Sequence, residues 1–316
     1  MKELKIYNFM GPSRAMVVVS AVLLLLSIVS LSTRGIHLGL DFSGGTQIEV
    51  GYQQPAAVET VRAQLVDAGF DGPTVVHFGA ETEVLLRLKE IPVVDQAAVQ
   101  SEEQQPDIGQ RVVAALSAGG EQIELRRVDY VGPQIGEELR EEGGLGMLVA
   151  LAVVMLYVAV RFQFKFALGA VLALAHDVIL TLGFFSVTQM EFDLTVLAAI
   201  LAVIGYSLND TIIVFDRVRE NFRKLRKTQA VDVINESLSQ TLWRTLNTSV
   251  TTLLVLLALY IFGGELIHNF SAALLFGVLV GTYSSIYVAA NLLLLLKVSR
   301  EDLLQPVEGE LVDDLP

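Results

Sequence analysis

Six long apolar runs with few charges constrain the fold of this chain more than any other sequence feature. They occupy residues 15–33, 143–160, 166–188, 193–216, 246–262 and 270–296. A helix needs about 20 mostly apolar residues to cross a hydrocarbon core roughly 30 Å thick. Because the runs approach or exceed that length and polar segments separate them, they predict six transmembrane helices instead of one large buried core.

The charge distribution narrows the class of protein further. Charged residues make up 18% of the chain, whereas soluble domains carry about 25%, and hydrophobic residues make up 53%. The net charge is −13, and the basic residues cluster beside the apolar runs. A nucleic-acid-binding protein needs a basic patch on a folded face, so this class is excluded. The absence of cysteine excludes disulfides and thiolate metal sites.

The basic residues also predict an orientation in the membrane. Among the termini and the short connections, Lys and Arg occur in residues 1–14, 161–165, 217–245 and at the start of 297–316, whereas 189–193 and 263–269 contain none. Positive residues accumulate on the cytoplasmic side, so we expect a cytoplasmic N-terminus, a basic cytoplasmic connection at 217–245 and an acidic cytoplasmic tail at 297–316. The first run lacks an A-x-A cleavage pattern at its end, which favours an uncleaved anchor over a signal peptide.

Residues 34–142 form the one long segment between spans, and we expect them outside the cytoplasm because long loops translocate regardless of charge. The pattern predicts strands at 46–52, 74–79, 83–89 and 121–130, and helices at 56–68 and 107–118, with a polar loop at 95–107. The order β-α-β-β-α-β indicates an α+β ferredoxin-like domain. It carries no cluster with catalytic spacing, so its predicted role is binding or mechanical movement.

Several polar residues interrupt the third and fourth runs. Asp177 lies in the middle of the third, Asn209 and Asp210 lie in the fourth, and Asp216 lies near its end. A charge at the centre of a spanning helix costs about 2.5–3.5 kcal/mol, so each needs a reason. Gly205, Asn209 and Asp216 share one helix face, with Asp210 beside it. We therefore expect this polar arc to line the bundle interior or a wet cavity.

The fifth run begins with a polar stripe at helical spacing. Its members are Arg244, Asn247, Thr248, Thr251 and Thr252. Desolvation disfavours an ionised carboxylate, whereas a neighbouring guanidinium favours it. A carboxylate and a guanidinium on two spanning helices therefore suggest a proton relay, driven by the roughly 2.3 kcal/mol that a charge gains per 100 mV.

Structural alternatives remain for each of these residues. Asp216 would make an end-cap or loop contact at the membrane surface, and Arg244 would extend to the cytoplasm by snorkelling. Asp177 would be a buried partner for a neighbouring amide or hydroxyl group, and Asp210 would have a purely structural role. His176 would be a packing residue, and it has no second His at i+4, which disfavours a metal site.

Other motifs are absent or unspecific. The sequence contains no G-x-x-x-x-G-K-[ST], G-x-S-x-G or H-E-x-x-H pattern, so we expect no ATP use, no hydrolytic or redox chemistry, and no cofactor. Gly277 and Gly281 form a small-xxx-small pair, which is typical of close helix packing.

Four segments resemble the SecD/SecF family of protein-export membrane proteins, which belongs to the RND-type superfamily. Residues 34–46 (RGIHLGLDFSGGT) resemble the segment after the family's first span, and 131–136 (VGPQIG) resemble the one before the second. Residues 205–221 (GYSLNDTIIVFDRVREN) and 244–249 (RTLNTS) are similar to the fourth-span and fifth-span signatures of its SecF branch. The resemblance covers nearly the whole chain.

This resemblance implies pairing with SecD in a twelve-helix assembly of the bacterial cytoplasmic membrane. The assembly would use the proton gradient to promote export of preproteins through SecYEG, with YajC and YidC as further contacts. Asp210 would carry the proton, with Arg244 as its switching partner and Asn209 nearby. Asp177, Asn247, Thr248 and Asp216 would support them. The Gly44-Gly45 pair would at least shape the chain entering the first strand.

Two other functions remain open. One is an independent RND-type exporter of small molecules, although such pumps carry two six-span halves and two large outer loops, and this chain has one of each. The other is a passive scaffold that stabilises the translocon, in which Asp210 and Arg244 would be dispensable.

Overall fold

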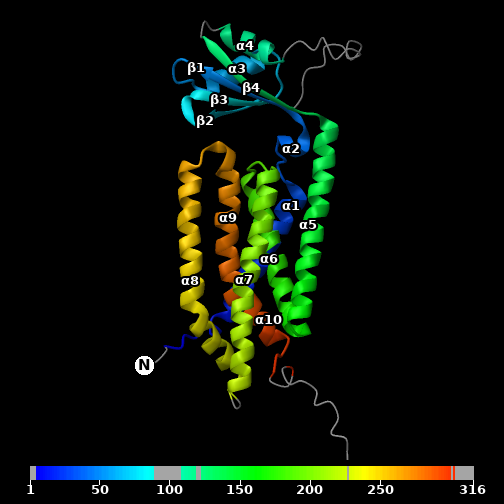
Figure 1. Cartoon of the computed structure of the whole chain (residues 1–316), viewed down its shortest axis with the longest axis vertical. Coiled ribbons are helices and arrows are strands. Elements are labelled where there is room, and N and C mark those ends of the chain that lie inside the picture. The colour runs from blue at the N-terminus through cyan, green and yellow to red at the C-terminus, as the bar shows by residue number, and fades with distance from the viewer. Residues whose placement is uncertain (1–4, 89–107, 119–121, 226–227, 300–301, 303–316) are drawn as a thin grey trace, which may run out of the picture.

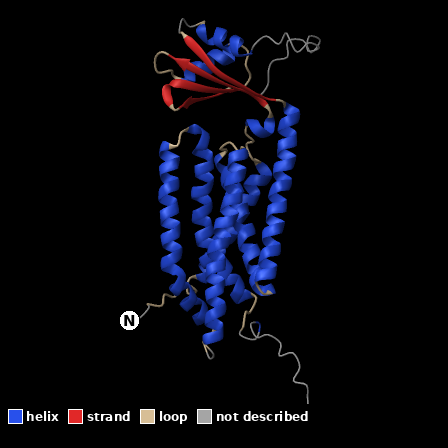
Figure 2. Ribbon diagram, in the orientation of Figure 1, coloured by secondary structure: helices blue, strands red, loops and turns tan. Residues whose placement is uncertain are grey.

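The computed structural model of this protein describes residues 5–88, 108–118, 122–225, 228–299 and 302. It consists of a bundle of long helices with a small sheet domain at one end (Figures 1 and 2). We call the bundle end beside the sheet the domain end, and the opposite one the distal end. The predicted loop 95–107 and most of the tail lie outside the described residues.

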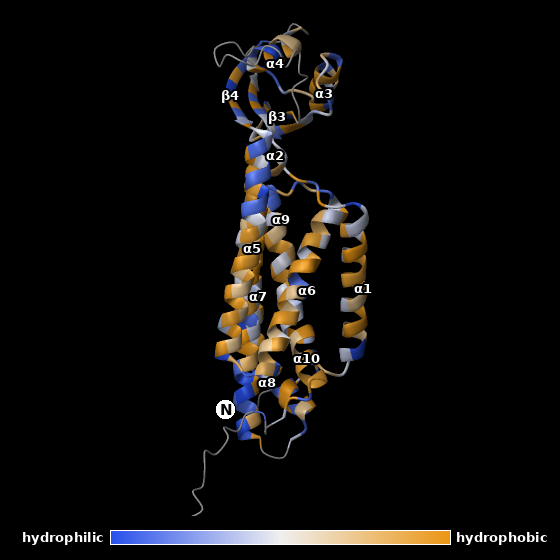
Figure 3. Cartoon of the chain, turned by 90° about the vertical axis from the view of Figure 1, so that its right-hand side faces the viewer, coloured by the Kyte–Doolittle hydropathy of each residue, from blue (hydrophilic) through white to orange (hydrophobic). Residues whose placement is uncertain are grey.

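The described residues contain six helices that are long and apolar enough to span a membrane, which agrees with the six predicted runs. They are α1 (Ser13–Thr33), α5 (Pro133–Arg161), α6 (Phe164–Thr188), α7 (Leu194–Lys224), α8 (Ala230–Phe262), and α9 (Glu265–Tyr283) continued by a π-helical segment (Ser284–Ala289) and α10 (Ala290–Leu295). Hydrophobic residues predominate along most of the length of the bundle helices, which are largely orange in Figure 3.

The helices differ in how much of their surface this chain covers. The central helix α6 contacts α1, α5, α7 and α9 and buries more than half of its residues. By contrast, α5 buries only Gly136 and Val158. The outer surfaces of α5 and α8 are therefore left to lipid or to another membrane protein.

Two helices extend beyond the apolar runs that predicted them. The helix α7 ends at Lys224 and α8 begins at Ala230, so most of the expected connection 217–245 is helical. Asn221 Nδ2 donates to Ser237 Oγ (2.9 Å) and to Gln240 Oε1 (3.0 Å), which joins the two extensions. Hydropathy marks only the lipid-facing part of a helix, whereas a helix that satisfies its own backbone continues into polar surroundings.

The sheet domain has the predicted element order. It comprises β1 (Gly45–Tyr52), α3 (Val58–Asp67), β2 (Thr74–Phe78), β3 (Ala80–Leu88), α4 (Ile108–Ser117) and β4 (Ile123–Val131). The strand order is β2-β3-β1-β4 and all neighbours are antiparallel, which is the ferredoxin-like arrangement. Its core lies between the sheet and the two helices, and includes Ile48, Val50, Leu65, Val84, Leu86, Val112 and Leu116.

The Gly44-Gly45 pair turns the chain from the short helix α2 (Leu40–Ser43) into β1. Gly44 has φ 71° and Gly45 has φ 137°, which favours glycine. A Cβ on Gly44 would lie 2.8 Å from Pro133 Cα, and one on Gly45 would collide with the Leu88 carbonyl. This geometry supports the interpretation that the pair shapes the entry to the first strand.

Candidate functional site

The carboxyl group of Asp210 is the most unusual polar group in the bundle. The residue lies in the middle of α7 and is 1% exposed. No described residue hydrogen-bonds its Oδ2 atom. Buried polar groups in native proteins nearly always have a partner, so an unpartnered carboxyl oxygen inside a spanning bundle calls for a functional explanation.

Thr245 of α8 faces Asp210. The register follows from two contacts between α7 and the antiparallel α8: Tyr206 Oη donates to Ser249 Oγ (3.2 Å), and Asn221 pairs with Ser237. Because Asp210 follows Tyr206 by one turn and Thr245 precedes Ser249 by one turn, the two residues lie opposite each other. Thr245 is 2% exposed and its Oγ1 has no partner among the described residues.

Sequence reasoning did not select Thr245 as a site residue. The signal was present, because Thr241, Thr245 and Ser249 recur at i, i+4 and i+8 and define a second polar row on α8. All three are buried, whereas Arg244, Asn247, Thr248 and Thr251 of the predicted stripe are exposed on the neighbouring face of the helix. The row that faces the carboxyl group is therefore this inner one.

Arg244 lies close enough to Asp210 for its charge to act on the carboxyl group. In the described residues, however, no ion pair within 4.0 Å joins them. Arg244 and Asn247 are exposed, and neither side chain makes a hydrogen bond to a described residue. The predicted switching partner thus stands beside the carboxyl group and turns outward from it.

A polar face runs along the outside of α7 and α8. We define it by Asn209, Arg244, Asn247 and Thr248, all of which are exposed. Of the predicted arc on α7, only Asp210 lies inside this bundle, because Gly205 and Asn209 lie on its outer surface. Charged and amide groups are costly in hydrocarbon, so this face needs a polar membrane partner or water to cover it.

Asp177 occupies a separate buried site on α6. Ser284 Oγ donates to its Oδ2 (2.6 Å), and Ser207 Oγ donates to the same atom through a short hydrogen bond. His176 Nδ1 bonds to its Oδ1 (2.9 Å). With the side chain fully buried, these three contacts support the alternative that Asp177 is a partner for neighbouring hydroxyl groups.

Asp216 lies at the distal end of the bundle. Arg161 Nη2, at the last residue of α5, pairs with Asp216 Oδ2 at 3.0 Å. Both side chains are more than two-fifths exposed, so the pair contributes little to stability. Asp216 therefore makes the end contact that the alternative interpretation described, away from the buried carboxyl group. No group of three or more described His, Asp or Glu side chains is arranged to hold a metal ion.

The loop between α6 and α7 joins the bundle to the sheet domain. Glu191 in this loop pairs with Arg87 of β3, and both side chains are more than four-fifths buried. Phe192 N donates to the His37 carbonyl (2.8 Å), and Gly39 N donates to the Phe192 carbonyl (2.9 Å). The helix that carries Asp210 therefore starts at the point where the sheet domain is held.

We predict that Arg87→Gln loosens this junction while the sheet domain stays folded. The substitution leaves Glu191 without its cation, at a cost of about 1.5–3 kcal/mol for a hydrogen bond to a charged group. Hydrogen exchange should then speed up at the amides of Gly39 and Phe192. Arg62→Gln removes an exposed pair within α3 and is the control. Unchanged exchange in Arg87→Gln would show that the pair does not hold the junction.

The fold and site together define a class: a polytopic membrane protein with a ferredoxin-like domain after its first span and a buried, unpartnered carboxyl group in its fourth. A sequence profile described as protein export membrane protein SecD/SecF, C-terminal, matches residues 111–299, and one for the SecD/SecF GG motif matches residues 29–56. The chain belongs to the SecD/SecF family of protein-export membrane proteins.

Its relatives include proteins named protein translocase subunit SecF. That of Pseudomonas aeruginosa is 51% identical over 98% of this chain and 97% of its own length. That of Vibrio alginolyticus is 48% identical over 100% of this chain and 99% of its own length. A crystal structure of SecDF from Thermus thermophilus, described as a translocon-associated membrane protein, matches with a TM-score of 0.79 at 36% identity. The match covers 94% of this chain and 40% of the SecDF chain.

Proposed function

We propose that this chain is the SecF-type subunit of the Sec protein translocase. In this proposal it pairs with SecD in the bacterial cytoplasmic membrane and couples proton entry to the export of unfolded proteins through SecYEG. The proton gradient is the energy source, and no cofactor takes part. The observation that carries the proposal is the buried carboxyl group of Asp210, which lacks a hydrogen-bond partner at Oδ2 and lies beside an outward-facing guanidinium.

In this proposal SecD binds to the polar face of α7 and α8. SecD would cover Asn209, Arg244, Asn247 and Thr248, which lie exposed in the isolated chain. Covering them removes the cost of placing a charge and amides against lipid. Since this chain matches two-fifths of the SecDF chain, the remainder of such an assembly offers the polar groups that Arg244 lacks here.

A proton on Asp210 would act through charge. The ionised carboxylate attracts Arg244, whereas the protonated acid does not, so each proton gained or lost changes the force between α7 and α8. Since α7 begins directly after the loop that holds the sheet domain, a shift of α7 would move that domain. In this proposal both termini of the chain lie in the cytoplasm. The sheet domain lies on the opposite side of the membrane, where it acts on the emerging polypeptide.

Reconstitution in proteoliposomes tests this function. We expect export through SecYEG to be stimulated only when this chain, SecD and an imposed pH gradient are all present. Stimulation that persists without the gradient would favour a passive scaffold. Proton-driven dye efflux by this chain without SecD would favour an independent exporter.

A further inference from the structure

We propose that His176 and Asp177 form a second proton-binding site, loaded from a cavity between α1, α6 and the π-helical segment, and linked through that segment to the surroundings of Asp210. This site is distinct from the carboxyl group of the proposed relay. The inference rests on the proposed function only in taking the proton as the coupling ion.

The hydrogen bonds of Asp177 fix the tautomer of His176. The Oδ2 atom of Asp177 accepts from Ser207 and Ser284, and Oδ1 faces His176 Nδ1 at 2.9 Å. When Asp177 is ionised, its carboxylate only accepts hydrogen bonds, and in that state Nδ1 carries the imidazole proton and Nε2 carries the lone pair. His176 is 3% exposed, and its Nε2 has no partner among the described residues. A proton acceptor is therefore left free inside the bundle.

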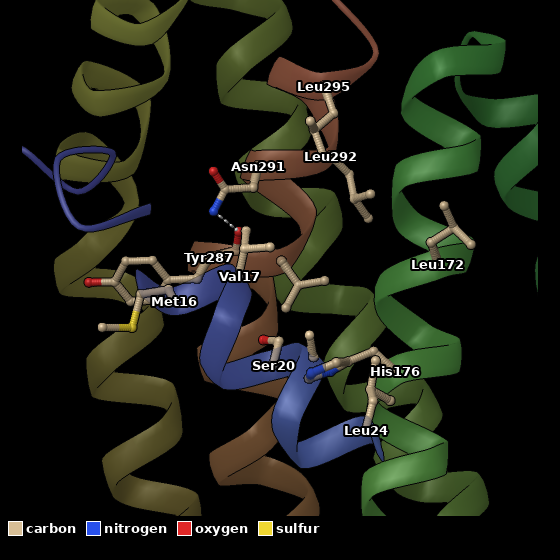
Figure 4. A pocket seen from close by; sticks show the side chains of 12 residues that line it. Met16, Val17, Ser20, Leu24, Leu172, His176, Tyr287, Asn291, Leu292 and Leu295 are labelled. Carbon is tan, nitrogen blue, oxygen red and sulfur yellow. Dashed lines mark hydrogen bonds between the residues drawn. The ribbon is translucent and has the colours of Figure 1, made fainter. Parts of the chain in front are cut away.

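His176 also contributes to the lining of a cavity of about 300 Å³ (Figure 4). Four polar side chains from four elements line it, namely Ser20 of α1, His176 of α6, Tyr287 of the π-helical segment and Asn291 of α10, and the rest of the lining is apolar. One water needs roughly 10–15 Å³ of probe-occupied space, so the cavity has room for water beside these polar groups. Its lining includes the exposed residues Val17 and Leu172, which lie at the outer surface of the bundle.

The described groups around the pair carry no positive charge. The described groups that face the pair are Ser20 from α1, Ser207 from α7, Tyr283 from the end of α9, and Ser284 and Tyr287 from the π-helical segment. None of these is a cation. With neutral His176 the site therefore holds one uncompensated negative charge at membrane depth, which is costly. A proton on Nε2 produces an imidazolium beside the carboxylate and brings the site to neutrality.

The π-helical segment connects this site to Asp210. Its first residue, Ser284, bonds to Asp177, and its second, Ser285, bonds to Thr211 Oγ1 at 2.9 Å. Thr211 is the neighbour of Asp210 on α7. Single π-helical turns are rare and often mark functional positions. If the carboxylate releases Ser284, the segment can return to α-helical winding, which would turn Ser285 away from Thr211.

Histidine-resolved ¹⁵N NMR tests the site directly. The probe is the complex with SecD in lipid nanodiscs, titrated between about pH 8 and pH 5, with His176 assigned by loss of its signals in His176→Asn. We expect a neutral ring protonated at Nδ1 that gains a second proton at Nε2. A ring that stays neutral throughout, or one protonated only at Nε2, would overturn the proposal.

The variant His176→Asn also tests function, because its amide can still donate to Asp177 but cannot take a proton. We expect the complex to assemble, to bind one proton fewer across the titration, and to lose most of its export stimulation. If proton count and stimulation both stay normal while Asp210→Asn is inactive, the second site is rejected and the proposed function stands.

A pair of substitutions on α1 tests whether protons reach His176 through the cavity. Val17 lines the cavity, whereas Val18 is exposed and does not. We expect Val17→Phe to slow proton uptake at His176 by tenfold or more and Val18→Phe to leave it unchanged. Equal uptake rates in the two variants would exclude the cavity as the entry path.

Discussion

We expect Asp210→Asn to abolish proton-driven stimulation of export and to leave assembly with SecD intact. The amide has nearly the same shape as the acid but cannot lose a proton, so the charge that acts on Arg244 never appears. The side chain is buried, and the interior around it contains Thr245 Oγ1 as an unpartnered hydroxyl. An amide fits such a polar interior without the cost of an ionised group. The loss is therefore functional rather than structural.

The measurement is preprotein uptake into proteoliposomes under an imposed pH gradient, alongside co-purification with SecD. Asp216→Asn is the matched control, because it removes an exposed carboxylate from the same helix, where the pair with Arg161 contributes little. We expect the control to retain its stimulation. Normal stimulation by Asp210→Asn would exclude Asp210 as the proton carrier.

We expect Gly277→Leu to weaken the fold and Gly205→Leu to weaken the binding of SecD, and together they test which surface SecD covers. Gly277 on α9 lies against Val203 of α7, so a larger side chain there forces the two helices apart. Overpacking of this kind costs about 1–3 kcal/mol or more. The Cβ position of Gly205 meets nothing within 4 Å, so the isolated chain accommodates leucine there. Gly205 precedes Asn209 by one turn and borders the polar face.

We therefore expect Gly277→Leu to lower the thermal stability of the isolated chain in detergent, and Gly205→Leu to keep it. In co-purification with SecD, Gly205→Leu should lose most of the partner, because its side chain would occupy the space that SecD fills in the proposed assembly. Full recovery of SecD with Gly205→Leu would place the partner on another surface. Thermal stability that is equal in the two variants would contradict the packing of α7 on α9.

The element order of this chain was predictable because its signals are local. Alternating apolar residues such as Ile123 and Leu125 predicted the strands, and uncharged runs predicted the spans. The ends of helices were less predictable. Residues 217–245 are rich in charge and were expected to be a connection, whereas most of them form the ends of α7 and α8. The contacts that join these ends, such as Asn221 with Ser237, depend on tertiary packing.

The sequence predicted which types of residue form the site, but not which helix faces turn toward one another. Helical spacing shows that Arg244 and Asn247 share a face, but it does not show which face of α8 meets α7. Since α8 is polar on two sides near Asp210, the inner row containing Thr245 could be separated from the outer stripe only by three-dimensional packing. The hydrogen bonds that hold Asp177 likewise depend on Ser207 and Ser284, which come from two other elements.

The helix α5 joins the sheet domain to the far end of the bundle as one rigid rod. Only Gly132 separates the end of β4 from Pro133, and the helix continues without a break to Arg161. Its 29 residues correspond to a length of about 43 Å. For a lever of this length, a tilt of about 5° at the sheet displaces the opposite tip by about 4 Å. Such a displacement would separate Arg161 from Asp216. A motion of the sheet domain could therefore be detected as the loss of this ion pair on the other side of the bilayer.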